Sequence, residues 1–89
     1  MYEVVLTARA HHEFNKLSSI DQDRVEAALD HLRNNPRATG IRKILGSIYR
    51  IRVGDWRVIY VVFDKNNLVL VGRIARRSED TYDRVKDLF

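Results

Sequence analysis

Two segments rich in β-branched and aromatic residues, 48–53 and 56–63, stand on either side of the dipeptide Gly54-Asp55. This composition favours strands. Glycine followed by aspartate suits a tight turn, because glycine accepts positive φ angles and aspartate is a common turn residue. The stretch therefore predicts a β-hairpin, and a two-residue loop fixes which residues of the two strands face each other.

The hairpin is expected to place its charged side chains together on one face. The predicted pairs are Val53–Trp56, Arg52–Arg57, Ile51–Val58, Arg50–Ile59 and Tyr49–Tyr60. Side chains alternate between faces, so one face is apolar and the other, called here the arginine face, carries Arg50, Arg52 and Arg57. Arginines that lie opposite one another repel. The pattern indicates an anion site, and the alternative is a solvated face whose charges oppose edge-to-edge aggregation.

The rest of the chain completes an α+β pattern. The expected elements are a strand at 2–7, a helix at 8–17 capped by Thr7, a helix from Ser19 to residue 34, a polar connection at 37–47, a strand at 68–75 and a short helix after Ser78. Ser19 and Gln22 fit a capping box. The order β-α-α-β-β-β-α predicts one domain over residues 1–89, a small, twisted, mainly antiparallel sheet with a helical hairpin on one face.

The register of the last strand is the difficult point of this prediction. A four-residue loop at 64–67 would place on the arginine face Leu68, Leu70, Gly72, Ile74 and Arg76. Arg73 would then lie on the apolar face, unless it is near the sheet edge or a β-bulge shifts the register.

Charge and composition narrow the classes of partner. Residues 37–77 hold ten basic and two acidic side chains, which indicates phosphate or an acidic protein as the ligand. The chain has no cysteine, which excludes disulfides and zinc–thiolate sites. No apolar run in the sequence is long enough to span a membrane, and we expect no secretory leader. The expected location is therefore the cytoplasm.

No residue pattern predicts a metal or a cofactor. His11 and His12 are adjacent and His31 is on another helix, so all three are expected at the surface or the core edge. No nucleophile signature and no glycine-rich phosphate loop is present. The arginines and Tyr82 remain, a set suited to holding a phosphodiester and stabilising the charge of its transition state.

At these residues the chain resembles a known family. The run YRIRVGDWRVIY at 49–60, with Ala75-Arg76-Arg77 and Tyr82, is similar to the RelE/ParE superfamily of bacterial toxin–antitoxin toxins, closest to the RelE branch. The resemblance implies a RelE-like ribonuclease fold. It also implies an endoribonuclease that cuts mRNA in the ribosomal decoding site, through attack by a 2′-hydroxyl and without a metal.

The resemblance also implies roles for individual residues and a set of partners. It implies catalytic roles for Arg57, Arg76 and Tyr82, and RNA or phosphate contacts for Arg50, Arg52 and Arg77. The partners would be the 70S ribosome, mRNA and a cognate antitoxin. For the antitoxin we expect an acidic amphipathic helix that covers the sheet or displaces the C-terminal helix.

One departure from the branch affects the chemistry. Arg50 and Arg52 stand where the branch commonly has lysines, and arginine stays protonated, so neither can be a general base. Proton transfer would fall to Tyr82, to Glu79 or Asp80, or to the ribosome. Two other functions remain open: a ParE-like toxin that inhibits DNA gyrase without nuclease activity, and a general RNA-binding domain.

Overall fold

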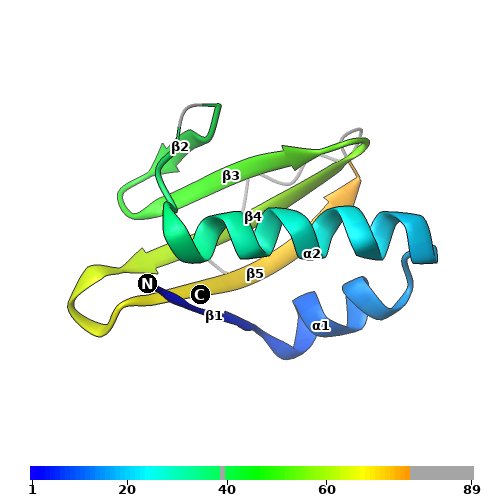
Figure 1. Ribbon diagram of the computed structural model, residues 1–89, viewed down its shortest axis with the longest axis horizontal. Coiled ribbons are helices and arrows are strands. Elements are labelled where there is room, and N and C mark those ends of the chain that lie inside the picture. The colour runs from blue at the N-terminus through cyan, green and yellow to red at the C-terminus, as the bar shows by residue number, and fades with distance from the viewer. Residues whose placement is uncertain (39, 77–89) are drawn as a thin grey trace.

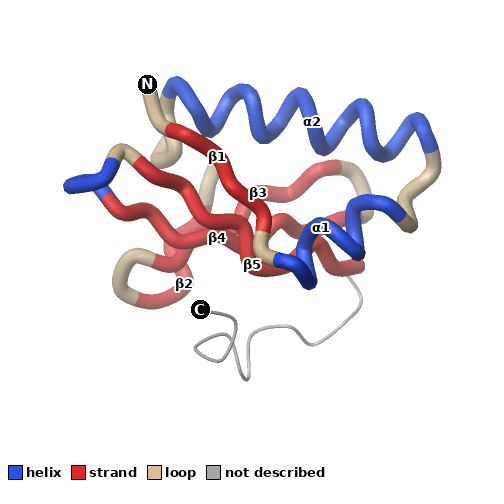
Figure 2. The backbone as a smooth tube through the Cα atoms, turned by 90° about the horizontal axis from the view of Figure 1, so that it is seen from below, coloured by secondary structure: helices blue, strands red, loops and turns tan. Residues whose placement is uncertain are grey.

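The computed structural model describes residues 1–38 and 40–76, which form two layers (Figure 1). The elements are β1 (Glu3–Leu6), α1 (Ala8–Asn15), α2 (Ser19–Asn34), β2 (Arg42–Leu45), β3 (Ile48–Val53), β4 (Trp56–Phe63), the 3₁₀ turn η1 (Asp64–Asn66) and β5 (Leu68–Arg76). The strands form one sheet in the order β1-β5-β4-β3-β2. Figure 2 shows both helices on the same side of this sheet. The α+β class is confirmed.

The central hairpin has the predicted register. All five expected pairs between β3 and β4 are present, from Val53 opposite Trp56 to Tyr49 opposite Tyr60. Gly54 has a φ of 60°, a value that glycine adopts without the penalty other residues carry. The sheet is mainly antiparallel, with β1 and β5 as its parallel pair among the described strands.

The segment expected to be a polar connection contains an additional strand. β2 pairs antiparallel with β3 through Arg42 opposite Arg50 and Lys43 opposite Tyr49, and its register shifts before Leu45. The prediction of a loop over 37–47 is therefore wrong for these residues. The expected helix after Ser78 lies outside the described residues.

Both helices begin at a hydroxyl cap. Thr7 Oγ1 accepts from the Ala10 N–H at 3.2 Å, as predicted. At α2 the cap is Ser18, whose Oγ accepts from the Asp21 N–H at 3.2 Å, so the predicted capping box at Ser19 is wrong by one residue. Ser18 is the residue with an extended ψ of 160°, which a cap requires, whereas Ser19 is already helical.

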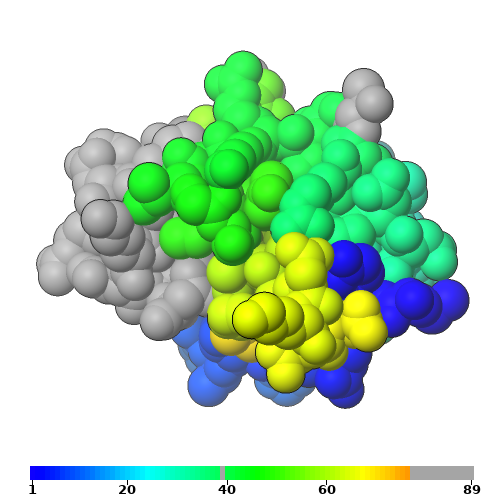
Figure 3. All heavy atoms as spheres, turned by 90° about the vertical axis from the view of Figure 1, so that its left-hand side faces the viewer, coloured from blue at the N-terminus to red at the C-terminus, as the bar shows by residue number. Residues whose placement is uncertain are grey.

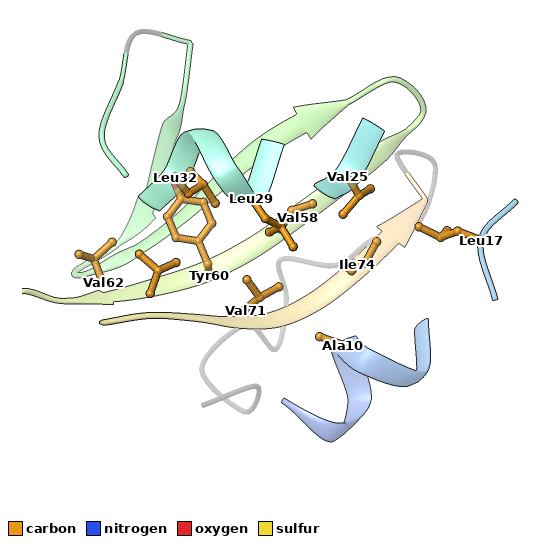
Figure 4. Close-up of a cluster of buried hydrophobic side chains, with 11 residues drawn as sticks. Ala10, Leu17, Val25, Leu29, Leu32, Val58, Tyr60, Val62, Val71 and Ile74 are labelled. Atoms are coloured by element: carbon orange, nitrogen blue, oxygen red, sulfur yellow. The ribbon is translucent and has the colours of Figure 1, made fainter. Parts of the chain in front are cut away.

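One hydrophobic core joins the helices to the sheet (Figure 4). The spacing of Val25, Ala28, Leu29 and Leu32 predicts one apolar stripe on α2, of which Val25, Leu29 and Leu32 are buried and Ala28 is half-buried. The stripe packs with inward-facing residues of β4 and β5, which include Val58, Tyr60, Val62, Val69, Val71 and Ile74. The spacing of Ala10, Phe14 and Leu17 predicts a similar stripe on the first helix; Ala10 and Leu17 are buried in the same cluster, and Phe14 packs against it partly buried.

A β-bulge in β5 changes the predicted faces. Ile59 lies opposite Arg73 and Tyr60 lies opposite Val71, so Gly72 is the extra residue. Before the bulge, Leu68 and Leu70 lie on the arginine face as expected, opposite Phe63 and Val61.

After the bulge the expected faces are reversed. Ile74, expected on the arginine face, is 2% exposed in the core. Arg76 lies opposite Trp56 on the helix side, and Arg73 moves to the arginine face. The bulge therefore keeps a charged side chain out of the core and places an isoleucine there.

A clasp of side chains closes one end of the sheet. Both Arg37 Nη atoms donate to the Asp64 carboxylate, at 3.0 and 2.8 Å, and Arg37 Nε donates to Tyr49 Oη at 2.9 Å. Tyr2 Oη donates to Asp64 Oδ1 at 2.7 Å. Figure 3 shows the N-terminus, the end of α2 and the turn after β4 side by side at this end. The clasp thus fixes the segment that leads from α2 into β2.

Candidate nucleic-acid interface

The arginine face is the surface of the sheet opposite the helical layer. Cross-strand pairing places Arg50, Ile59 and Arg73 in one row and Arg52, Arg57 and Ala75 in the next. Opposite residues lie about 5 Å apart at Cβ, so Arg52 and Arg57 are close like charges, as the sequence predicts. Arg73 is a further member, which the β-bulge brings to this face, one of the two alternatives that the sequence left open for it.

Arg50 is the buried charge of this face. Its residue is 6% exposed, and its Nε–H has no hydrogen-bond acceptor among the described residues. Arginine keeps its charge in proteins, and leaving a buried N–H donor without an acceptor is costly. A group with oxygen acceptors and negative charge would relieve this cost, so Arg50 marks a position for an anion.

A basic hollow opens beside Arg50 between β2 and β3. Its volume is about 540 Å³, and it is lined by Gly40, Ile41, Arg42, Lys43, Arg50 and Arg52. Four of these six residues are cationic, and the planar guanidinium matches the geometry of phosphate oxygens. Arg42 and Lys43 were missed by the sequence reasoning, because their strand was not predicted. The excess of basic residues over 37–77 was the signal that could have identified them.

Glu13 of α1 holds the end of β5 beside this face. Its Oε1 accepts from the Ile74 N–H at 2.8 Å, and its Oε2 accepts from Arg73 Nε at 3.0 Å. β1 pairs with β5 only as far as Val71. The carboxylate therefore satisfies an edge amide beyond the end of β1 and also pairs with the cation next to it.

The predicted catalytic pair Arg57 and Arg76 is not on one face. Arg57 is half-buried on the arginine face, whereas Arg76 is exposed one row away with its Cζ 4.9 Å from the ring centroid of Trp56. The other predicted residues, Arg77 and Tyr82, lie outside the described residues, as do the alternative proton acceptors Glu79 and Asp80.

Tyr2 and Tyr60 are poor candidates for the general base. A hydrogen bond to Asp64 raises the pKa of Tyr2. Burial raises the pKa of Tyr60, whose hydroxyl donates to the Pro36 carbonyl at 2.6 Å. Both phenols therefore stay protonated at neutral pH. The three histidines lie exposed on the helices, as predicted, and not on the arginine face.

The described part of the chain contains no group of three or more histidine, acidic or cysteine side chains that could hold a metal ion. None of its helices is long and apolar enough to span a membrane. What the described site offers is a set of fixed cations that can bind phosphates and stabilise negative charge.

Comparisons with known proteins agree with this arrangement. Residues 4–81 match the family described as the ParE toxin of the type II toxin–antitoxin system parDE. The chain is 36% identical over 80 residues to toxin RelE of Mycobacterium tuberculosis, covering 86% of this chain and 82% of that protein.

Solved structures show the same fold. The archaeal RelE–RelB complex of Pyrococcus horikoshii aligns with a TM-score of 0.81 and 25% identity, covering 88% of this chain and 97% of that one. The isolated E. coli RelE toxin aligns with a TM-score of 0.80 at 21% identity, over the full length of both chains. This chain therefore belongs to the RelE/ParE superfamily of type II toxin–antitoxin toxins, and within it to the RelE branch.

Proposed function

We propose that this chain is a ribosome-dependent endoribonuclease that cuts mRNA in the decoding site. The observation that carries the proposal is the arginine face, with its buried cation Arg50 and the basic hollow beside it. A protein that only inhibits another protein has no evident need for a buried guanidinium with an unsatisfied donor. A phosphodiester backbone supplies acceptors and charge to all of these groups at once.

Each cation has a part in the proposed reaction. Arg50 and Arg52 hold backbone phosphates, and Arg57 stabilises the charge that develops on the scissile phosphate. By resemblance to the family, Arg76 acts on the same phosphate, which from the helix side it would reach around the end of β5. Arg77, by resemblance to the family, adds a further phosphate contact.

The proposed cleavage balances without a metal. The ribose 2′-hydroxyl loses its proton and attacks the adjacent phosphorus. The bond to the 5′-oxygen breaks, and that oxygen takes up a proton, which leaves a 2′,3′-cyclic phosphate and a 5′-hydroxyl. By resemblance to the family, Tyr82 is the proposed base, since cations close to a phenol favour its phenolate. Glu79, Asp80 and the ribosome are the alternatives.

We propose a cognate antitoxin as the protein partner. The relatives from P. horikoshii and E. coli are known as complexes of RelE with RelB. An acidic amphipathic helix would complement the arginine face, by covering it or by displacing the segment after β5. Such a helix would block RNA from the same cations. Action on the ribosome would place the free toxin in the cytoplasm.

The test is induction of the chain in bacteria, followed by mapping of the new ends on translated messages. We expect cuts within codons, with 2′,3′-cyclic phosphate ends, that disappear when translation is blocked before induction. Arg57→Ala should lower cleavage by about 10²–10³-fold. Arg33→Ala on α2 removes one positive charge from the opposite layer and should leave cleavage unchanged.

The same cells distinguish the two toxin functions. An SOS response with gyrase-linked DNA breaks and intact messages would overturn the nuclease in favour of the gyrase inhibitor. Tyr82→Phe tests the base separately: growth arrest should be lost while antitoxin binding survives. Toxicity retained in Tyr82→Phe would remove Tyr82 as the base but leave the nuclease in place.

A further inference from the structure

Trp56 is a fixed aromatic ring at the tip of the hairpin. It opens β4, opposite Val53 on one side and Arg76 on the other. Its Nε1–H donates to Asp21 Oδ2 of α2 at 3.1 Å, and part of the ring packs on the hydrophobic core. Pairing, packing and this hydrogen bond together hold the indole plane in one orientation.

The guanidinium of Arg76 lies over this ring. Its Cζ lies 4.9 Å from the indole centroid, within the range of a cation–π contact. The residue is exposed, and no salt bridge joins it to a carboxylate within residues 1–38 and 40–76. The guanidinium is therefore supported from below by the indole and is accessible from outside.

This stack lies on the helix side of the sheet, in the row next to the last row of the arginine face. Trp56 and Arg57 are consecutive in β4, and Ala75 and Arg76 are consecutive in β5, so the row of Trp56 and Arg76 lies next to the row of Arg57. A single RNA strand with a phosphate at Arg57 would thus meet the stack where it continues over the hairpin end of the sheet.

We propose that Arg76, supported by Trp56, is a stacking site for an unpaired nucleobase. The proposal rests on the proposed function, because it takes RNA as the ligand of the neighbouring cations. Unpaired RNA bases stack on aromatic rings and on guanidinium planes. Stacking uses the plane of the guanidinium and leaves its N–H groups, which lie in that plane, available for phosphate. Because every base has a π-face, the site tolerates different bases and orients the strand.

The chain supplies its own probe, because Trp56 is its one tryptophan. The intact protein is titrated at low salt with an oligoadenylate of about eight nucleotides. A matched ribose-phosphate oligomer without bases serves as the control ligand. Anisotropy of an end label reports binding of either oligomer, and tryptophan emission reports contact at the stack.

We expect both oligomers to bind, and only the one with bases to quench the emission of Trp56. The oligomer without bases should bind about tenfold more weakly. Arg76→Lys, which keeps the charge but loses the plane, should remove this preference for bases. Arg33→Lys on α2 is the matched control and should keep it.

The outcomes separate the two proposals. If oligoadenylate binds without a change in tryptophan emission, or both oligomers quench equally, the stacking site is wrong while RNA binding by the arginine face stands. If neither oligomer binds, the arginine face does not bind RNA phosphates as the proposed function requires, and the proposed stacking site is then wrong as well. The titrations of the unaltered protein distinguish these outcomes even if a variant does not fold.

Discussion

Glu13 shows how one side chain sets the end of a strand. Its carboxylate accepts from the Ile74 amide and from Arg73, and its side chain is 19% exposed. Glu13→Ala would leave a buried donor without its acceptor, at a cost of about 1–3 kcal/mol. Glu13→Gln keeps one oxygen acceptor and should cost less.

Urea unfolding measures the loss in stability of the Glu13 variants, and hydrogen exchange of the Ile74 amide locates it. The Ile74 amide should exchange faster in Glu13→Ala. Glu26→Ala, which removes an exposed carboxylate from α2, is the control and should change neither quantity. An Ile74 amide that stays protected in Glu13→Ala would contradict the role assigned to Glu13.

The charge of Arg50 leads to a prediction about salt. If Arg50 holds a phosphate, Arg50→Ala should lower the slope of log K against log salt for single-stranded RNA by about one. The affinity at low salt should fall as well, because the lost contact releases one counterion fewer. Binding isotherms at four or five salt concentrations give the slope. A slope equal to that of the unaltered protein would show that Arg50 does not contact a phosphate.

At the scale of elements, adjacent serines before α2 provide a matched pair of variants. Ser18 caps the helix through its hydroxyl, whereas Ser19 is the first helical residue. Ser18→Ala should therefore destabilise the domain by about 1 kcal/mol. Ser19→Ala should be close to neutral, because alanine is the better helix former. Thermal or urea unfolding of both variants tests this, and an equal loss in both would contradict the assignment.

The strands differ in how far the sequence could predict them. The β3–β4 hairpin follows from local information, namely β-branched and aromatic residues on both sides of a Gly-Asp turn, so its register was predictable. β2 was not, because the four residues Arg42–Leu45 lie between glycines and alternate poorly. The bulge at Gly72 depends on distant partners: the Thr7 N–H donates to the Val71 carbonyl, and Glu13 binds the Ile74 amide. The arginine face and the position of Trp56 opposite Val53 were therefore predicted, while the face of Arg73 and the basic hollow required the tertiary structure.

For the whole molecule, charge is divided between the two layers. Residues 1–36, which form β1 and both helices, hold four basic and six acidic side chains, and residues 37–76, which form the other four strands, hold nine basic and two acidic ones. The helical layer therefore repels nucleic acid while the opposite face attracts it. This division favours one orientation of the protein on RNA, and it leaves the arginine face as the surface that an acidic antitoxin segment would complement.

The clasp of Arg37, Asp64 and Tyr2 makes the stability of the whole molecule depend on pH. Hydrogen bonds from Arg37 and then from Tyr2 lower the pKa of Asp64 below its ordinary value of 3.8. A carboxyl whose pKa is lower in the folded state stabilises the fold above its unfolded pKa, and this contribution is lost as the pH falls through the folded value. Asp64→Asn should therefore be less stable than the unaltered protein at pH 7, and the difference should shrink from about pH 4 downward. Urea midpoints measured from neutral to acid pH test this, with the exposed Asp23→Asn on α2 as the control for loss of a carboxylate. A difference for Asp64→Asn that stays constant down to the lowest pH would show that the clasp does not act through the Asp64 charge. A shrinking difference would show that one ion pair joins the N-terminus, the end of α2 and the β4–β5 turn, and so holds in place the segment that leads into the basic hollow.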